Sequence, residues 1–167
     1  KQAAREGAPE GAIVVADEQT AGKGRLQRQW LTPPGSGLAL SVVLRPRLAE
    51  LRGLTIVASL ATVRAIQETT GLEPRIKWPN DVLIRGKKVC GILIDSEIQG
   101  EVVQSAIIGL GLNVNLEPGA FSEIAETATS LSSELGREVS RLEVLRRLLI
   151  QMERYYTALR SGESLHE

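Results

Sequence analysis

The sequence has very few of the side chains that support nucleophilic or metal chemistry. Its 167 residues include one cysteine, Cys90, which excludes an internal disulfide and a cluster of thiolate ligands. The single histidine, His166, is the penultimate residue, so we expect neither a histidine-based triad nor a histidine metal site. No apolar run is long enough to span a bilayer, and no signal peptide is evident. These absences predict a reduced, cytoplasmic protein.

Aromatic residues and net charge are also scarce. Aromatic residues make up 3% of the chain and hydrophobic residues 43%, so aliphatic side chains must fill the core of a single domain. Twenty basic and 20 acidic residues cancel, which disfavours a dedicated nucleic-acid binder. The positive charge is nevertheless local, because residues 19–49 contain no acid. The cations of this region are Lys23, Arg25, Arg28, Arg45 and Arg47. Such an island suits a small anionic ligand.

The pattern of apolar residues predicts an α+β fold. Strands are expected at residues 12–17, 38–46, 75–81, 82–98 and 102–115, with a tight hairpin turn at Arg85-Gly86 inside the fourth range. Spacings of three and four predict a helix over 50–71 and another after Ser140, which is expected to cap it. The apolar stripe of this last helix consists of Leu142, Leu145, Leu148, Leu149, Met152, Tyr155 and Leu159. We therefore expect a mixed or antiparallel sheet with helices packed on one side.

The stretch "AGKGRLQRQW" at residues 21–30 is the strongest candidate for a binding loop. Its glycines, Gly22 and Gly24, permit backbone conformations that bring amides close to an anion. Its cations add charge and donors, and arginine grips two oxygens of a phosphate or carboxylate at once. Trp30 is placed to pack over an apolar ligand. A solvated surface loop is the alternative, and the glycine spacing matches neither a nucleotide-hydrolase phosphate loop nor a dinucleotide fingerprint.

Two further motifs combine polar and small residues. In "KWPND", residues 77–81, Lys77 lies in an expected strand, either buried against a ligand or on an exposed face, and Asp81 is most simply a turn former. In "GLGLNVN", Gly109 and Gly111 alternate along one face, which leaves space for a ligand or for an element packed above. Cys90 lies in an apolar strand and is interpreted as core.

Taken in order, "DEQTAGKGRLQRQW", "KWPND", "KKVCGILID" and "IGLGLNVN" closely resemble the biotin protein ligase family. The resemblance covers nearly the whole chain. It implies a fold related to class II aminoacyl-tRNA synthetases and lipoate ligases. It also implies that biotin reacts with ATP, assisted by Mg²⁺, to give biotinyl-5′-AMP, and that a lysine of a biotin carboxyl carrier protein then accepts the biotin.

The resemblance also assigns roles to residues of this chain. Those expected to be catalytic are Lys77, Arg25 and Arg28. Those expected to bind biotin are Gln19, Gly22, Lys23, Gly24, Trp30, Gly91 and Ile92. Those expected to bind the nucleotide are Arg25, Arg28, Trp78, Asn80 and Asn113. The Mg²⁺ ligands are not assigned. Lys23 stands where the family commonly has arginine, which predicts a weaker grip on the adenylate.

The domain expectation is one catalytic domain over residues 1–167, without the family's Ser-Thr-Asn segment before it or its small β-barrel domain after it. A homodimer through a sheet edge is also expected, with no nucleic-acid or membrane partner. Three alternatives stay open at this point. One is a lipoate or octanoate enzyme of the same fold, the second is a non-catalytic nucleotide-binding remnant, and the third is nucleic-acid binding through the basic loop.

Overall fold

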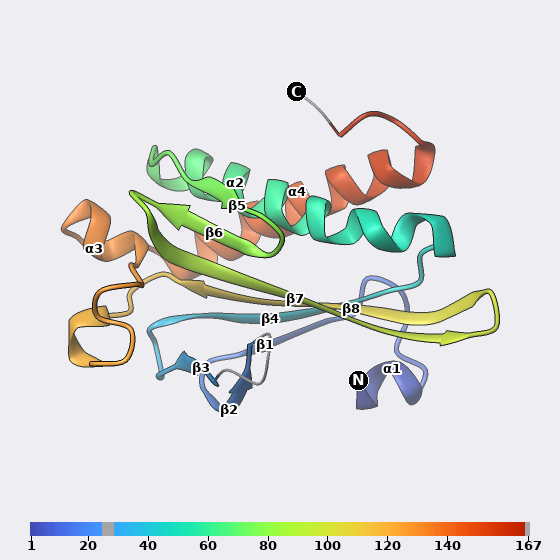
Figure 1. The fold of residues 1–167 in the computed structure, drawn as a ribbon, viewed down its shortest axis with the longest axis horizontal. Helices are drawn as coiled ribbons and strands as arrows, with labels where there is room; N and C mark the ends of the chain where they lie inside the picture. Colours follow the sequence, from blue (N-terminus) through green and yellow to red (C-terminus); the bar gives the residue numbers. More distant parts are fainter. Residues whose placement is uncertain (25–28, 166–167) are drawn as a thin grey trace.

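The structure of the protein, a computed structural model, describes residues 1–24 and 29–165. The strands of its main sheet are β1 (Ile13–Ala16), β4 (Gly37–Leu44), β5 (Arg75–Lys77), β6 (Asp81–Ile84), β7 (Lys87–Gln99) and β8 (Val102–Asn113). These form one six-stranded sheet in the order β1-β4-β8-β7-β6-β5, and every neighbouring pair is antiparallel (Figure 1). The antiparallel alternative of the predicted sheet is therefore confirmed.

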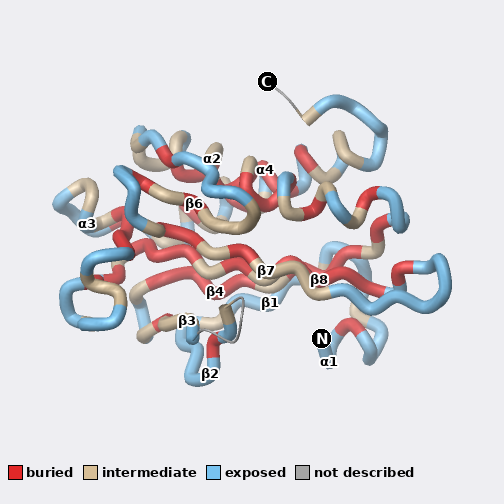
Figure 2. The backbone as a smooth tube through the Cα atoms, viewed as in Figure 1, coloured by how far each residue is buried: buried red, intermediate tan, exposed pale blue. Residues whose placement is uncertain are grey.

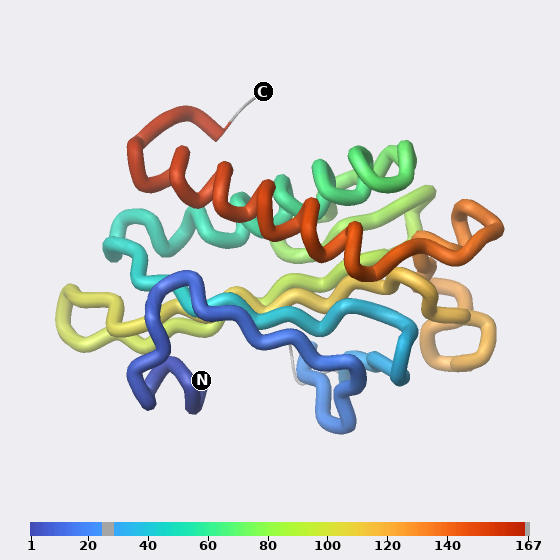
Figure 3. The backbone as a smooth tube through the Cα atoms, turned by 180° about the vertical axis from the view of Figure 1, so that it is seen from behind, coloured from blue at the N-terminus to red at the C-terminus, as the bar shows by residue number. Residues whose placement is uncertain are grey.

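Two long helices cover one face of this sheet. They are α2 (Leu54–Thr70) and α4 (Arg141–Ser161), which pack against each other and lie on the same side of the strands (Figures 1 and 3). The shorter helices are α1 (Gln2–Arg5), η2 (Leu48–Gly53), η3 (Pro118–Ala120) and α3 (Leu131–Leu135). In the described part of the chain, α1 and a small hairpin lie on the opposite face (Figure 1). The predicted α+β class, with the main helices on one side, is confirmed.

The core lies between these helices and the sheet (Figure 2). The apolar face predicted for the first long helix is wholly buried in α2, at Leu54, Val57, Ala58, Ala61 and Ala65. From β7 and β8, alternate residues point to the same layer, because side chains along a strand change face at every step. They include Cys90, Ile92, Ile108, Leu110 and Leu112. The other face of both strands points away from this core.

The stripe predicted for α4 is wrong at its first position. Leu148, Met152 and Tyr155 are buried, whereas Leu142 is 76% exposed. Six residues separate Leu142 from Leu148, and at about 100° per residue this places Leu142 about 120° away from the inward direction. Val144, four residues before Leu148, is buried instead. Helix geometry therefore directs Val144, rather than Leu142, toward the core in the first turn of α4.

The polar stretch between the first two predicted strands is not simply a loop. Its flanks form a second, two-stranded sheet of β2 (Gln19–Lys23) and β3 (Gln29–Thr32). Gly22 pairs with Trp30 in this hairpin, and a Cβ on Gly22 would overlap the Trp30 carbonyl oxygen. Glycine is therefore required here for close strand contact, whereas the sequence interpretation assigned it to bringing backbone amides close to an anion. Residues 25–28 lie outside the described chain.

Two local predictions from sequence are confirmed. The turn between β6 and β7 has positive φ at both Arg85 (49°) and Gly86 (82°), as the tight hairpin requires. The side chain of Ser140 caps α4 by accepting a hydrogen bond from the Glu143 amide at 3.3 Å. Within residues 1–24 and 29–165, no helix combines the length and apolar character needed to cross a membrane.

Candidate ligand-binding site

The candidate site lies on the sheet face that α2 and α4 leave open. Its floor is a row of residues on β7 and β8 that face away from the core, and two of its register pairs contain glycine: Gly91 with Gly111, and Leu93 with Gly109. Because three of these four residues have no side chain, the middle of the sheet is hollowed along its surface. The alternating glycines of β8 thus clear space on the open face, away from the helices.

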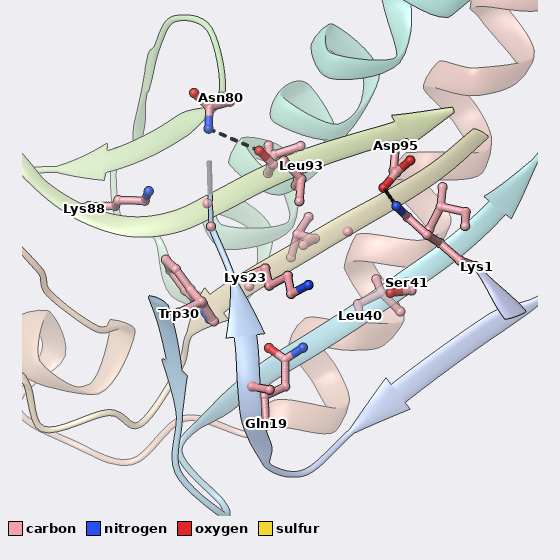
Figure 4. Close-up of a pocket in the computed structure, with 18 residues that line it drawn as sticks. Lys1, Gln19, Lys23, Trp30, Leu40, Ser41, Asn80, Lys88, Leu93 and Asp95 are labelled. Atoms are coloured by element: carbon pink, nitrogen blue, oxygen red, sulfur yellow. Dashed lines mark hydrogen bonds and ion pairs between the residues drawn. The ribbon is translucent and has the colours of Figure 1, made fainter. Parts of the chain in front are cut away.

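The hairpin β2–β3 forms one wall of this hollow. Gln19 and Lys23 from β2 and Trp30 from β3 line the hollow (Figure 4). The indole of Trp30 packs on the paired glycines: a Cβ on Gly91 would lie 3.1 Å from Trp30 Cζ3, and one on Gly111 would lie 2.8 Å from Cζ2. The two glycines therefore serve to admit an aromatic ring against the strands.

A β-bulge brings Lys88 into the site. The register of β6 with β7 shifts so that Val82 pairs with Cys90 and Leu83 with Lys88, which leaves Val89 as the extra residue. Strict alternation from Gly91 would turn Lys88 toward the helices, but the bulge re-aims it to the open face. A Cβ on Gly91 would in fact lie 3.1 Å from Lys88 Nζ.

The ammonium group of Lys88 is held by two neighbours. It lies 2.7 Å from an Asp81 carboxylate oxygen and 5.3 Å from the centre of the Trp30 ring. The backbone beneath it is fixed as well, since the Lys88 amide donates to Thr127 O at 2.8 Å and Lys88 O accepts from the Thr129 amide at 2.9 Å. Lys88 is therefore a cation with a defined position at the edge of the hollow.

The hollow encloses a volume of about 280 Å³, close to the lower end of roughly 300–1,000 Å³ that is usual for small-molecule sites. It is lined by Lys1, Gln19, Ala21, Lys23, Gly24, Trp30, Leu40, Ser41, Asn80, Lys88, Gly91, Ile92, Leu93, Asp95, Ile107, Gly109, Leu110 and Gly111. These lining residues include three lysines and one carboxylate, Asp95, which is itself paired with Lys1 (Figure 4). The other side chains are aliphatic, apart from the indole of Trp30 and the polar groups of Gln19, Ser41 and Asn80. This composition fits a small ligand that is partly apolar and carries negative charge.

The structure brings together many of the residues predicted from sequence. Those that line the hollow are Gln19, Lys23, Gly24, Trp30, Asn80, Gly91 and Ile92. Asn80 is fixed there because its side chain donates to Ile92 O at 3.2 Å and its own carbonyl accepts from the Ile92 amide at 2.9 Å. Ile92 also belongs to the core between the sheet and the helices, so it contributes both to the core and to the lining of the hollow.

The other predicted residues lie elsewhere. Lys77, on the edge strand β5, and Trp78 after it are exposed, Trp78 by 68%, and neither lines the hollow. Gly22 is buried against Trp30, and Asn113 is buried with its side-chain amide donating to Thr129 O at 3.1 Å. The predictions for Arg25 and Arg28 fall outside the described residues, and all of these roles stay predictions.

Sequence reasoning missed several lining residues, of which Lys88 matters most. The pair Lys87-Lys88 was visible, but the bulge that turns Lys88 toward the open face has no local signature. Ser41 and Asp95 were also missed, although both lie on the glycine face. Ser41 pairs with Gly109 across β4 and β8, and Asp95 follows Gly91 at a spacing of four along β7. Both residues alternate with buried neighbours along their strands, and this period of two could have placed them on the glycine face.

Cys90 behaves as the sequence suggested. It is fully buried on the helix side, and burial raises the pKa of its thiol to about 12. A neutral thiol with no exposed surface is not available as a nucleophile. Within the described chain, no group of three or more histidine, cysteine, aspartate or glutamate side chains is placed to hold a metal ion.

The open-face cavity, the glycine-thinned strands and the cationic wall define a small-molecule-binding α+β domain. Residues 2–113 match the model of the biotin/lipoate A/B protein ligase family. The chain is 44% identical over 156 residues to the bifunctional ligase/repressor BirA of Bacillus subtilis, covering 92% of this chain and 48% of that protein. It is 41% identical over 140 residues to the biotin–[acetyl-CoA-carboxylase] ligase of Paracoccus denitrificans, covering 80% and 58%.

Among solved structures, the chain is similar to the biotin protein ligase of Aquifex aeolicus in complex with biotin and ATP. The TM-score is 0.83 at 34% identity, with 97% of this chain and 67% of the other covered. The chain thus belongs to the biotin/lipoate A/B protein ligase family. It spans about half the length of the curated relatives it matches.

Proposed function

We propose that this protein activates biotin with ATP and transfers it to a lysine of a biotin carboxyl carrier protein. The observation that carries the proposal is the cavity itself, which combines an apolar floor with three lysines among its lining residues. The floor, over Gly91, Leu93 and Gly109, suits the fused rings and aliphatic chain of biotin. Lys88 and Lys23 suit its carboxylate and a phosphate. The names of the relatives and the bound molecules of the Aquifex ligase support the same assignment.

In the first step, a carboxylate oxygen of biotin bonds to the α-phosphorus of ATP while the bond to the bridging oxygen of pyrophosphate breaks. In the second step, the carrier amine attacks the acyl carbon, AMP leaves, and the amine loses a proton. Neither step needs a covalent nucleophile from the enzyme, which is consistent with a buried Cys90. The protein has to position two anions and offset their repulsion, and lysines fixed in a partly enclosed site do this.

We assign the lysine that neutralises the reacting carboxylate and phosphate to Lys88. Lys88 is held at the cavity by Asp81 and Trp30, whereas Lys77, the lysine that the sequence motif predicts, is exposed on an edge strand and stays the second candidate for this role. The interpretation of Arg25 and Arg28 as phosphate ligands stays part of the proposal.

Mg²⁺ belongs to the proposal as an ion that accompanies the triphosphate. Magnesium is commonly held by one or two carboxylates together with substrate phosphates. The described residues fit this pattern, because Asp95 lines the cavity while no ready-made cluster of acidic ligands is present among them. Asp95 is therefore the residue we expect nearest to such an ion.

The alternatives from sequence are less well supported. An octanoyl transferase of this fold would need a reactive thiol, and the pKa of Cys90 is raised to about 12. A non-catalytic nucleotide-binding remnant is less well supported, because the cavity keeps the cationic side chains of Lys23 and Lys88 along its edge. The curated relatives reported above carry biotin ligase or ligase/repressor names, so biotin is the substrate we propose over lipoate.

A second copy of the chain is proposed as a further partner. β1 lies at one edge of the sheet, pairs only with β4 among the described strands, and exposes Ile13, Val14 and Val15. An apolar edge strand of this kind favours pairing with another strand. Sedimentation velocity over a range of concentrations should show a dimer, and a monomer throughout the range would contradict it.

The assignment of Lys88 is tested by three alanine variants in biotin-dependent exchange of labelled pyrophosphate into ATP. Lys88→Ala should lower the exchange rate by about 10²–10³-fold, the loss typical of removing one electrostatic stabiliser. Lys87→Ala is the matched control, because this exposed neighbour on β7 does not line the cavity, and it should keep the wild-type rate. Lys77→Ala should stay within about tenfold of wild type, since the contact of an exposed lysine is weak. Loss of exchange in Lys77→Ala with normal exchange in Lys88→Ala would reverse the assignment.

A further inference from the structure

The hairpin that forms the cavity wall is an excursion from the main sheet. The chain leaves the sheet at the end of β1, forms β2 and β3, and returns at Gly37, the first residue of β4. This excursion supplies Gln19, Ala21, Lys23, Gly24 and Trp30 to the cavity. Residues 17–18 form the outgoing stem of this excursion, and residues 33–37 form its returning stem. The shape of the cavity therefore depends on how these two stems are held.

One side chain contacts both stems. Arg141, the first residue of α4, donates from Nη1 to Asp17 Oδ1 at 2.5 Å on the outgoing stem and to Gly37 O at 3.3 Å on the returning stem. Figure 3 shows the start of α4 beside the ends of β1 and β4. The Arg141 hydrogen bond lowers the pKa of Asp17, with a further contribution from the Gly35 amide, so the carboxylate stays ionised at neutral pH.

The start of α4 is a firm base for these contacts. The Asn115 side chain donates to Val139 O at 2.9 Å, and its Oδ1 accepts from the Val139 amide at 2.9 Å. The Asn115 amide in turn donates to Ser36 O, on the returning stem, at 2.7 Å. The end of β8, the start of α4 and the returning stem are therefore joined at one point.

The residue type at position 141 is also informative. A cation in the first turn of a helix is unfavourable because the helix dipole places partial positive charge there. The ion pair with Asp17 offsets this cost, and the other basic residues of α4 for which a partner is known pair elsewhere. Arg146, for example, lies 3.7 Å from Glu143 on the same helix and contacts neither stem. Arg141 thus departs from the preference against a cation in the first turn of a helix, and it makes a tertiary contact instead. Such departures are typical of functional positions.

We propose that Arg141 is a positioning residue for biotin binding. It holds Asp17 and Gly37 together, and so fixes the base of the hairpin that places Gln19, Lys23 and Trp30 over the sheet. Arg141 does not line the cavity itself and acts through the hairpin. The inference rests on the proposed function for its ligand, but the hairpin contacts stand apart from it.

The test compares Arg141→Gln, Arg141→Lys and Asp17→Asn with the control Arg146→Gln. In amide hydrogen exchange, Arg141→Gln should speed exchange of residues 17–24 and 29–37 by up to about fivefold, because an exposed ion pair contributes about 0.2–1 kcal/mol. The amides of β7 and β8 should keep their protection. In biotin-dependent pyrophosphate exchange, KM for biotin should rise by about three- to tenfold, while kcat stays within about twofold.

The variants should also show that the two side chains act together. Arg141→Lys keeps the charge, so its KM for biotin should lie between that of wild type and that of Arg141→Gln. Asp17→Asn combined with Arg141→Gln should raise KM little beyond Arg141→Gln alone, because both changes remove the same contact. Arg146→Gln should match wild type in both measurements.

Three results would overturn the inference. One is wild-type hairpin exchange in Arg141→Gln, the second is a fall in kcat without a rise in KM, and the third is faster exchange spread equally over β7 and β8, which would mean a general structural role. A wild-type protein that exchanges no pyrophosphate with biotin would contradict the proposed function instead. In that case the hydrogen-exchange comparison would still decide whether Arg141 holds the hairpin.

Discussion

Replacing Gly111 with alanine tests whether the paired glycines exist to seat Trp30. A Cβ at this position would lie 2.8 Å from Trp30 Cζ2 and closer still to Nε1 and Cε2, which no real side-chain contact tolerates. Either the indole or the strand must move. We therefore expect the hairpin to be displaced from the floor of the cavity.

Forcing extra volume into a packed contact costs about 1–3 kcal/mol. We expect Gly111→Ala to lower the free energy of unfolding by an amount in this range, measured by urea denaturation. Gly109→Ala is the matched control two residues away on the same face, where the nearest heavy atom to a Cβ would be Leu93 O at 3.4 Å. It should change stability by less than about 0.5 kcal/mol, because that contact is ordinary and alanine suits a strand at least as well as glycine. Both variants should raise KM for biotin, since both fill the floor.

A double-mutant cycle separates the clash from other effects. In a Trp30→Ala background the added methyl group at Gly111 meets no indole. Gly111→Ala should then cost less than about 0.5 kcal/mol, so the two changes should couple by about 0.5 kcal/mol or more. Equal stability of Gly111→Ala and wild type, or strict additivity with Trp30→Ala, would refute the reasoning.

Two further predictions follow from single positions. Burial raises the pKa of Cys90 to about 12, above the value of about 8.5 for an unfolded thiol, so its contribution to stability is complete below about pH 8.5 and is lost as the pH rises toward 12. At pH 8 a thiol reagent should modify the folded protein slower than the urea-unfolded protein by roughly a thousandfold, the ratio of thiolate fractions, and similar rates would contradict the burial. Gly86→Ala should lower the unfolding free energy by roughly 1–2 kcal/mol, because φ is 82° and a Cβ there meets no neighbour within 4 Å, so the cost is backbone strain alone. A neutral outcome in thermal denaturation would show that the turn rearranges.

The sequence predicted those parts of the fold that depend on local patterns. The five apolar residues on one face of α2, the Arg85-Gly86 turn and the Ser140 cap were each recognisable within a few residues. Leu142 was misassigned because a stripe of leucines does not reveal which turn of a helix first reaches the sheet. The hairpin β2–β3 was missed because its strands are short, polar and glycine-containing, and its pairing is tertiary in origin.

The site was predicted in composition more than in geometry. The glycine alternation at Gly109 and Gly111 indicated space, and Trp30, which was expected to bind biotin, lines the same cavity. Lys88 was not recognisable as a lining residue, because its direction depends on a bulge in which Val89 is the extra residue. No period-two pattern contains that information. The role of Arg141 depends on a contact between residues far apart in the sequence, which only the fold reveals.

The most direct test of the central claim is exchange of labelled pyrophosphate into ATP by the unmodified protein, with biotin and lipoate compared side by side. The assay follows adenylate formation alone and requires no carrier protein. The cavity described here predicts exchange that requires biotin and is not supported by lipoate. A folded sample that exchanges no label with biotin, or that exchanges it equally well with lipoate, would contradict the proposed function.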